Sequence, residues 1–136
     1  MKLHVNLDER AITASPRSRA RIRTLSARRN DSLTIDVSFS MDGRTGPLPD
    51  GSLVSLFVYA GPATRTALVT ASTSTALNRG AKTVYRMSDV LFQLTSLEAQ
   101  FAANKVVPLV FEIRIGNSYN TITTAPVTLN VSQTAQ

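Results

Sequence analysis

The sequence predicts an all-β protein: an antiparallel β-sandwich of about seven to nine short strands with one short helix and a basic N-terminal arm. Three observations lead to this fold class. Several segments alternate apolar and polar residues with a period of two, which is typical of half-buried strands. Turn residues separate these segments at short intervals. The repeated helices that a parallel α/β fold needs are missing, and 136 residues fit one domain.

The clearest predicted strand runs from Leu33 to Met41. Its odd-numbered residues are apolar and its even-numbered residues are polar, so one face is expected to be buried. A charged turn at 27–31 precedes it, and Asp42-Gly43 follows it as a hairpin signal. This strand and its flanking turns are therefore the firmest local prediction.

Further short strands are expected at both ends of the chain and between the turns. Residues 53–59 are apolar on both faces, which indicates either a central strand covered on both sides or a strand that contacts a neighbouring chain. Proline at 108 places the start of another predicted strand at an edge or before the strand proper. The remaining predicted strands are 3–9, 11–13, 67–71, 83–87, 106–115, 119–124 and 127–131.

One short helix is expected at about 96–103. Thr95-Ser96-Leu97-Glu98 has the spacing of a capping box, and Leu97 and Phe101 lie one helical turn apart. Their apolar stripe should cover one end of the sandwich core.

The positive charge is concentrated near the N-terminus. The formal net charge is +6, yet the sequence after the first thirty residues is close to neutral. We therefore expect three segments: an N-terminal strand and arginine-rich arm at 1–26, a β-sandwich at 27–132, and a frayed tail at 133–136.

The arginine-rich arm allows three interpretations. Arg17, Arg19, Arg21 and Arg23 are spaced by two, so an extended chain would place them on one face. They could form a solvated loop or edge strand that blocks unwanted strand pairing, a docking arm that orders against a partner, or a nucleic-acid contact. The turn with Arg28, Arg29 and Asp31 is similarly open to local ion pairing or to subunit contact.

The residue types give no pattern of a catalytic, cofactor or metal site, and we expect no enzyme. There is no cysteine, which excludes disulfides, thiolate metal ligands and a cysteine nucleophile. His4 is the lone histidine, and its place on a terminal strand predicts a solvent-facing or structural role. The acidic residues are scattered, and most occupy turn or cap positions. The start lacks an apolar signal core, and no apolar run is long enough to cross a bilayer.

Several short motifs together resemble small tail-associated structural proteins of bacteriophages. They are a basic turn ending in Asn30-Asp31, a strand ending in Asp42-Gly43, the run Leu48-Pro49-Asp50-Gly51-Ser52, and the apolar strand that follows. Residues 83–85, the helix near Leu97, residues 110–113 and the N-terminal strand occupy similar places. More loosely, the chain resembles the N-terminal docking β-domains of baseplate and fibre proteins. Those domains usually precede a fibrous region, whereas the last predicted strand here is followed by only a few residues. The resemblance therefore implies either a self-contained adaptor or an adhesive part that is a separate chain.

The resemblance implies a non-enzymatic virion protein of the tail, baseplate or fibre attachment, assembled in the host cytoplasm and joined to other virion proteins. A homo-oligomer, trimeric or hexameric, is expected. The alternatives are a capsid or decoration protein and a nucleic-acid-binding module that uses the arm. A carbohydrate-binding module or an enzyme is the remaining and least favoured alternative. The expected partner contacts are Arg17, Arg19, Arg21, Arg23, Arg28, Arg29, Asp31, Leu53, Phe57 and Tyr59.

Overall fold

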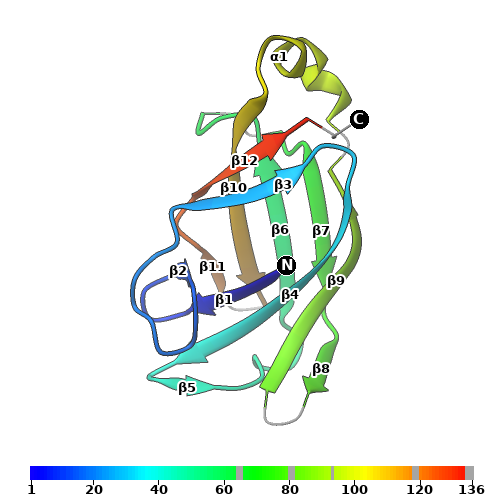
Figure 1. Ribbon diagram of the computed structural model, residues 1–136. Coiled ribbons are helices and arrows are strands. Elements are labelled where there is room, and N and C mark those ends of the chain that lie inside the picture. Colours follow the sequence, from blue (N-terminus) through cyan, green and yellow to red (C-terminus); the bar gives the residue numbers. More distant parts are fainter. Residues whose placement is uncertain (64–65, 80–81, 93, 118–119, 134–136) are drawn as a thin grey trace.

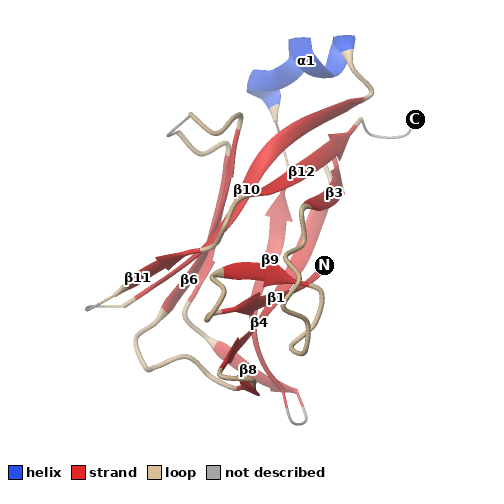
Figure 2. Ribbon diagram, turned by 90° about the vertical axis from the view of Figure 1, so that its left-hand side faces the viewer, coloured by secondary structure: helices blue, strands red, loops and turns tan. Residues whose placement is uncertain are grey.

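The computed structural model describes residues 1–63, 66–79, 82–92, 94–117 and 120–133. Two β-sheets face each other as a sandwich, and one short helix lies at one end (Figures 1 and 2). The predicted all-β class with one short helix is therefore confirmed.

The first sheet, sheet A, has six strands in the order β2-β1-β4-β9-β8, with β5 paired to β4 beside this path. Asp42 and Gly43 connect β4 to β5 with positive φ angles of 52° and 75°, as a tight two-residue hairpin requires. Asp89, at φ 54°, lies in the irregular register between β4 and β9, where an extra residue forms a bulge. The strands of sheet A are β1 (Lys2–Asn6), β2 (Ala11–Thr13), β4 (Ser32–Met41), β5 (Arg44–Thr45), β8 (Ala76–Arg79) and β9 (Lys82–Leu91).

The second sheet, sheet B, has six strands in the order β3-β12-β10-β6-β7, with β11 paired to β10. Its long central strand β10 is antiparallel to both β6 and β12. The strands of sheet B are β3 (Thr24–Arg28), β6 (Leu53–Tyr59), β7 (Val69–Thr73), β10 (Val106–Gly116), β11 (Thr121–Thr123) and β12 (Val127–Ser132).

The strand count and the strand directions differ from the prediction. The described residues form twelve strands rather than seven to nine, because β3, β5 and β8 are short and have little apolar alternation. Two pairs, β1 with β4 and β3 with β12, are parallel, whereas antiparallel pairing was expected. Parallel neighbours need long connections, so local sequence patterns do not show them.

The N-terminal strand belongs to the sandwich itself. The predicted boundary set residues 1–26 apart from the sandwich, but β1 lies between β2 and β4, and Val5 is fully buried. β3 also crosses the predicted boundary at 26/27. Within residues 1–26, the longest segment outside the strands is the connection between β2 and β3, residues 14–23. The predicted frayed tail falls mostly at 134–136, outside the described residues.

The helix occupies the predicted place but lacks the predicted cap. A 3₁₀ turn, Thr95–Leu97, leads into α1 (Glu98–Ala103). Leu97 is the N-cap residue, and no side chain caps the helix, so the capping-box prediction was wrong. The 3₁₀ turn places Thr95 before the helix start, and leucine has no oxygen with which to cap.

The core fills the space between the sheets with side chains from both. Phe39, Phe92, Phe101 and Phe111 are among the largest fully buried side chains. Phe101 of α1 closes the end of the core, as the predicted apolar stripe required. Within the described chain, no helix is long and apolar enough to span a membrane.

Candidate partner-contact surface

The arginine-rich connection is folded back on the edge of sheet A. The Ser18 N–H donates to the Ser15 carbonyl at 3.1 Å, which closes a turn that contains Pro16. The backbone of Arg21 then forms an isolated antiparallel β-bridge with Thr13, and the Ile22 N–H donates to the Ile12 carbonyl at 2.8 Å. This connection, 14–23, covers the free edge of β2, which is the edge-blocking role among the three interpretations.

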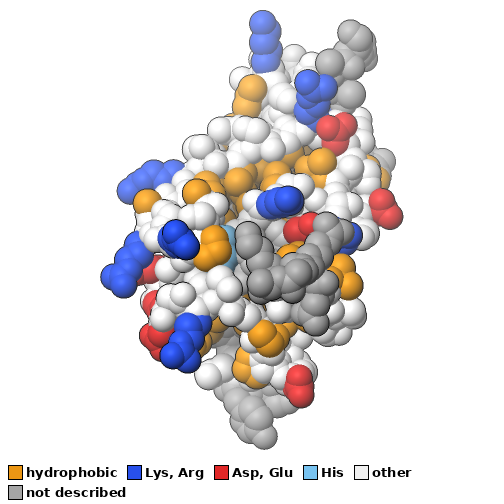
Figure 3. All heavy atoms as spheres, turned by 60° about the horizontal axis from the view of Figure 1, so that its bottom comes forward, with side chains coloured by type: hydrophobic (Ala, Val, Ile, Leu, Met, Phe, Trp, Pro, Cys, Tyr) orange, Lys and Arg blue, Asp and Glu red, His pale blue; other side chains and the backbone are white. Residues whose placement is uncertain are grey.

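The four arginines of this connection are exposed, but a turned chain presents them rather than an extended strand. Two of them, Arg17 and Arg19, line a hollow of about 590 Å³ together with Asp8, Glu9 and Asp42. Figure 3 shows basic side chains at separate places on one face, with acidic side chains near several of them. These carboxylates lower the positive potential that a nucleic-acid backbone would meet.

The turn before β4 makes its contacts within the chain. The Arg29 guanidinium forms an ion pair with Glu98 and lies 4.8 Å from the centroid of the Phe101 ring. The Asn30 N–H donates to the Phe92 carbonyl at 2.8 Å, and the Asp31 carbonyl accepts from the Phe92 N–H at 3.0 Å. Arg29 therefore fits the local-pairing interpretation, and it connects this turn to α1.

The other two charged residues of this turn differ in exposure. The Arg28 side chain is exposed, whereas Asp31 is half-buried. Of the three, Arg28 is thus the most open to a partner.

The outer face of sheet B carries an aromatic and arginine cluster. The rings of Phe57 and Tyr59 are stacked, with centroids 6.2 Å apart and planes 11° from parallel. The Arg114 guanidinium lies 4.5 Å from the centroid of the Phe57 ring. Glu112 is paired opposite Phe57 on the neighbouring strand β10. We call these four residues the β6–β10 cluster.

Strand β6 therefore has one core face and one open face. Val54, Leu56 and Val58 are buried, whereas the cluster residues are half-buried and Leu53 is 46% exposed. The sequence named Leu53, Phe57 and Tyr59 as contact candidates, whereas it did not name Glu112 and Arg114, which the structure places beside Phe57. The alternation of 106–115 already placed these two on the non-core face, but the β6–β10 register that brings them to Phe57 is not local information.

The outer face of sheet A is polar and internally paired. His4 is buried between two serine hydroxyls of β4, with 2.7 Å from Nδ1 to Ser38 Oγ and 2.7 Å from Nε2 to Ser40 Oγ. These bonds join β1 to β4, which is a structural role for the histidine. His4 and Ser38 also line a hollow of about 330 Å³.

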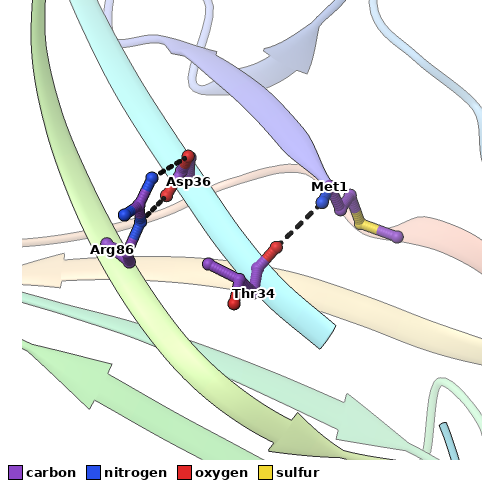
Figure 4. Close-up of polar contacts among 4 residues, drawn as sticks. All are labelled: Met1, Thr34, Asp36 and Arg86. Atoms are coloured by element: carbon purple, nitrogen blue, oxygen red, sulfur yellow. Dashed lines mark hydrogen bonds and ion pairs between the residues drawn. The ribbon is translucent and has the colours of Figure 1, made fainter. Parts of the chain in front are cut away.

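A bidentate ion pair lies beside this histidine. Arg86 Nε and Nη2 donate to the two Asp36 carboxylate oxygens at 2.7 and 3.0 Å, and the Met1 amine donates to the Thr34 carbonyl at 2.8 Å (Figure 4). The hydrogen bond to Asp36 raises the pKa of Arg86 above its ordinary value. While Asp36 is ionised, the positive charge of Arg86 therefore contributes its full stabilisation below the ordinary arginine pKa, and this contribution is lost only in strongly alkaline solution.

The Leu48–Ser52 run forms a turn that holds Leu48 in the core. The Pro49 carbonyl accepts from the Ser52 N–H at 3.2 Å and from its hydroxyl at 2.7 Å, and Gly51 has a φ of 83°. The buried Leu48 donates its N–H to the Tyr85 hydroxyl at 2.9 Å. The motif thus has a structural function in this chain. The described residues contain no group of acidic, histidine or cysteine side chains that could hold a metal ion.

Comparisons with known proteins include a likeness that extends over nearly the whole chain. No family model matches the sequence, and no curated protein matches it. Among solved structures, the chain is similar to the N-terminal domain of phage TP901-1 ORF48, at 15% identity and a TM-score of 0.33. The likeness covers 98% of this chain and 97% of that one. A similarity of this size carries no argument about function.

Proposed function

We propose that this chain is a non-enzymatic structural protein of a bacteriophage virion, a tail, baseplate or fibre-attachment adaptor that acts through subunit contacts. The β6–β10 cluster is the observation that carries the proposal. Tyrosine, phenylalanine and arginine are enriched in protein–protein contacts, and here they lie together on an open sheet face.

The surroundings of the cluster also fit a contact surface. Exposed Thr70 lies opposite Phe57 on β7, and Thr128 lies opposite Val110 on β12, so polar residues form a rim around the aromatic centre. The tail-protein motifs of the sequence support the same class of protein. The carboxylates beside Arg17 and Arg19 make this role a better fit than nucleic-acid binding.

The proposal is tested by measuring whether the chain assembles with the other structural proteins of the phage whose genome encodes it. Native mass spectrometry should show a homo-oligomer or a complex with tail proteins, and a particle reconstruction should place the chain in the tail. A strict monomer that joins no virion protein would contradict the proposal. A position in the capsid shell would replace it with the decoration-protein alternative.

A paired substitution tests the surface itself. Tyr59→Ser should weaken assembly about tenfold or more, because it removes an aromatic contact residue. Thr70→Ser, on the polar rim of the same face, is the matched control and should leave assembly unchanged. Equal behaviour of the two variants would show that another surface makes the contact.

A further inference from the structure

β3 has one open edge in the part of the chain that the structure describes. It pairs with β12 alone, in parallel register from Thr24 opposite Thr128 to Arg28 opposite Ser132. Figure 1 shows it at the border of sheet B beside β12. Its backbone can therefore accept a further strand on the side away from β12.

The hydrogen bonds at the two ends of β3 identify the backbone groups that face this open edge. The Arg23 carbonyl accepts from the Thr128 N–H at 3.0 Å, and the Arg29 N–H donates to the Ser132 carbonyl at 2.8 Å. In a parallel ladder, alternate residues direct their N–H and C=O groups to the same side, so the odd-numbered residues of β3 face β12. The N–H groups of Thr24, Ser26 and Arg28 consequently face away from β12.

In sheet A, by contrast, the edge strand β2 is covered. On sheet A, the connection 14–23 covers the outer edge of β2 through the Thr13–Arg21 bridge and the Ile22 to Ile12 hydrogen bond. No described residue covers the edge of β3 in this way. An uncovered edge strand is a template for pairing with an extended segment of another chain.

Side chains and charge define what such a segment would contain. Ala27 is buried and Leu25 is half-buried on the core side, so an added strand would continue the core with small apolar residues at alternate positions. Exposed Arg23 and Arg28 lie at the two ends of β3, which favours carboxylates at both ends of the added segment.

We propose that β3 is a strand-addition site for an extended partner segment with alternating small apolar residues and acidic ends. This inference rests on the proposed adaptor function and names the edge through which the chain would hold a neighbour. It differs from the β6–β10 cluster, which would bind through side chains rather than through backbone hydrogen bonds.

The probe is the synthetic peptide Asp-Val-Thr-Val-Thr-Val-Asp. It should bind the full chain and slow hydrogen exchange at the amides of Thr24, Ser26 and Arg28. Two N-methylated forms, one modified at the valines and one at the threonines, test the backbone geometry. Because alternate N–H groups point to opposite sides of a strand, only one of the two forms should lose binding.

A pair of variants tests the same edge from the protein side. Ser26→Pro removes an outward N–H without removing a bond to β12, and it should weaken peptide binding about tenfold. Ser26→Ala keeps the N–H and should bind like the unmodified chain. If Ser26→Pro fails to fold, the two N-methylated peptides still decide the question.

Three results would overturn the proposal: no binding of the peptide, equal binding of both N-methylated forms, or unchanged exchange at the three amides. Each would mean that Arg23 and Arg28 only protect the edge. A chain that assembles into particles while these amides still exchange rapidly would overturn the strand-addition site alone. A chain that joins no particle would instead count against the adaptor function.

Discussion

Tyr85 joins the core to the loop that carries Leu48. Its ring packs edge to face on the Phe39 ring, with the two ring centroids 5.5 Å apart, and its hydroxyl accepts a hydrogen bond from the buried Leu48 N–H. Tyr85→Phe keeps the ring but leaves that N–H without its acceptor, so the free energy of unfolding should fall by about 1–3 kcal/mol. Urea denaturation measures this change. Tyr59→Phe, on the half-buried outer face, is the control, and an equal loss in both variants would contradict the role of the Leu48 bond.

Gly43 and Gly46 allow the cost of a positive φ angle to be measured separately from packing. A Cβ atom added at either glycine meets nothing within 4 Å, so packing does not distinguish them. Gly43, however, has a φ of 75°, which is costly for residues with a Cβ atom. Gly43→Ala should lower the free energy of unfolding by about 1–2 kcal/mol, and Gly46→Ala should change it by less than about 0.5 kcal/mol. Similar effects in urea denaturation would mean that hairpin geometry is not what requires the glycine.

Two contacts attach the helix α1 to the sandwich: the buried Phe101 side chain and the ion pair of Glu98 with Arg29. Phe101 is fully buried, whereas the Glu98 side chain that pairs with Arg29 is 65% exposed. Burial should therefore hold α1 more strongly than the ion pair does. Phe101→Ala should lower the free energy of unfolding by about 3–5 kcal/mol, and Glu98→Gln by at most about 1 kcal/mol. A larger effect of Glu98→Gln would show that the ion pair, not the apolar contact, positions the helix.

At the scale of elements, the sequence predicts those with strong local patterns. β4, β6, β10 and β12 have clear apolar signals, and Asp42-Gly43 gives its turn directly. β3 was missed because Thr24-Leu25-Ser26-Ala27-Arg28 contains small and polar residues that carry little apolar signal. It becomes a strand through its pairing with β12, which lies about a hundred residues later.

At the candidate contact surface too, local sequence patterns predict some residues, whereas others come together only through long-range pairing. The apolar residues on both faces of 53–59 predicted either a strand covered on both sides or a strand that contacts a neighbouring chain. In the structure, Phe57 and Tyr59 are half-buried, so this chain does not fully cover their face of β6. Arg114 joins them because of the β6–β10 register, and Arg29 meets Glu98 across 69 residues of sequence. Such contacts depend on topology, which charge patterns and alternation do not encode locally.

The whole molecule should fold as one cooperative unit that includes its N-terminal strand. β1 lies between β2 and β4, where Leu3 and Val5 are 4% and 0% exposed, and its removal would expose both neighbouring strands and part of the core. Deletion of residues 1–13 should therefore abolish the cooperative thermal transition seen by circular dichroism.

The arginine-rich connection supplies the control for this deletion. Arg17→Gln and Arg19→Gln, at exposed positions in the connection, should change the free energy of unfolding by less than about 0.5 kcal/mol. Residues 27–132 that melt cooperatively by themselves would restore the boundary that the charge distribution predicted. Loss of the transition on deletion, with little change in the glutamine variants, would mean that the basic charge lies on a surface connection and that the strand before it belongs to the core.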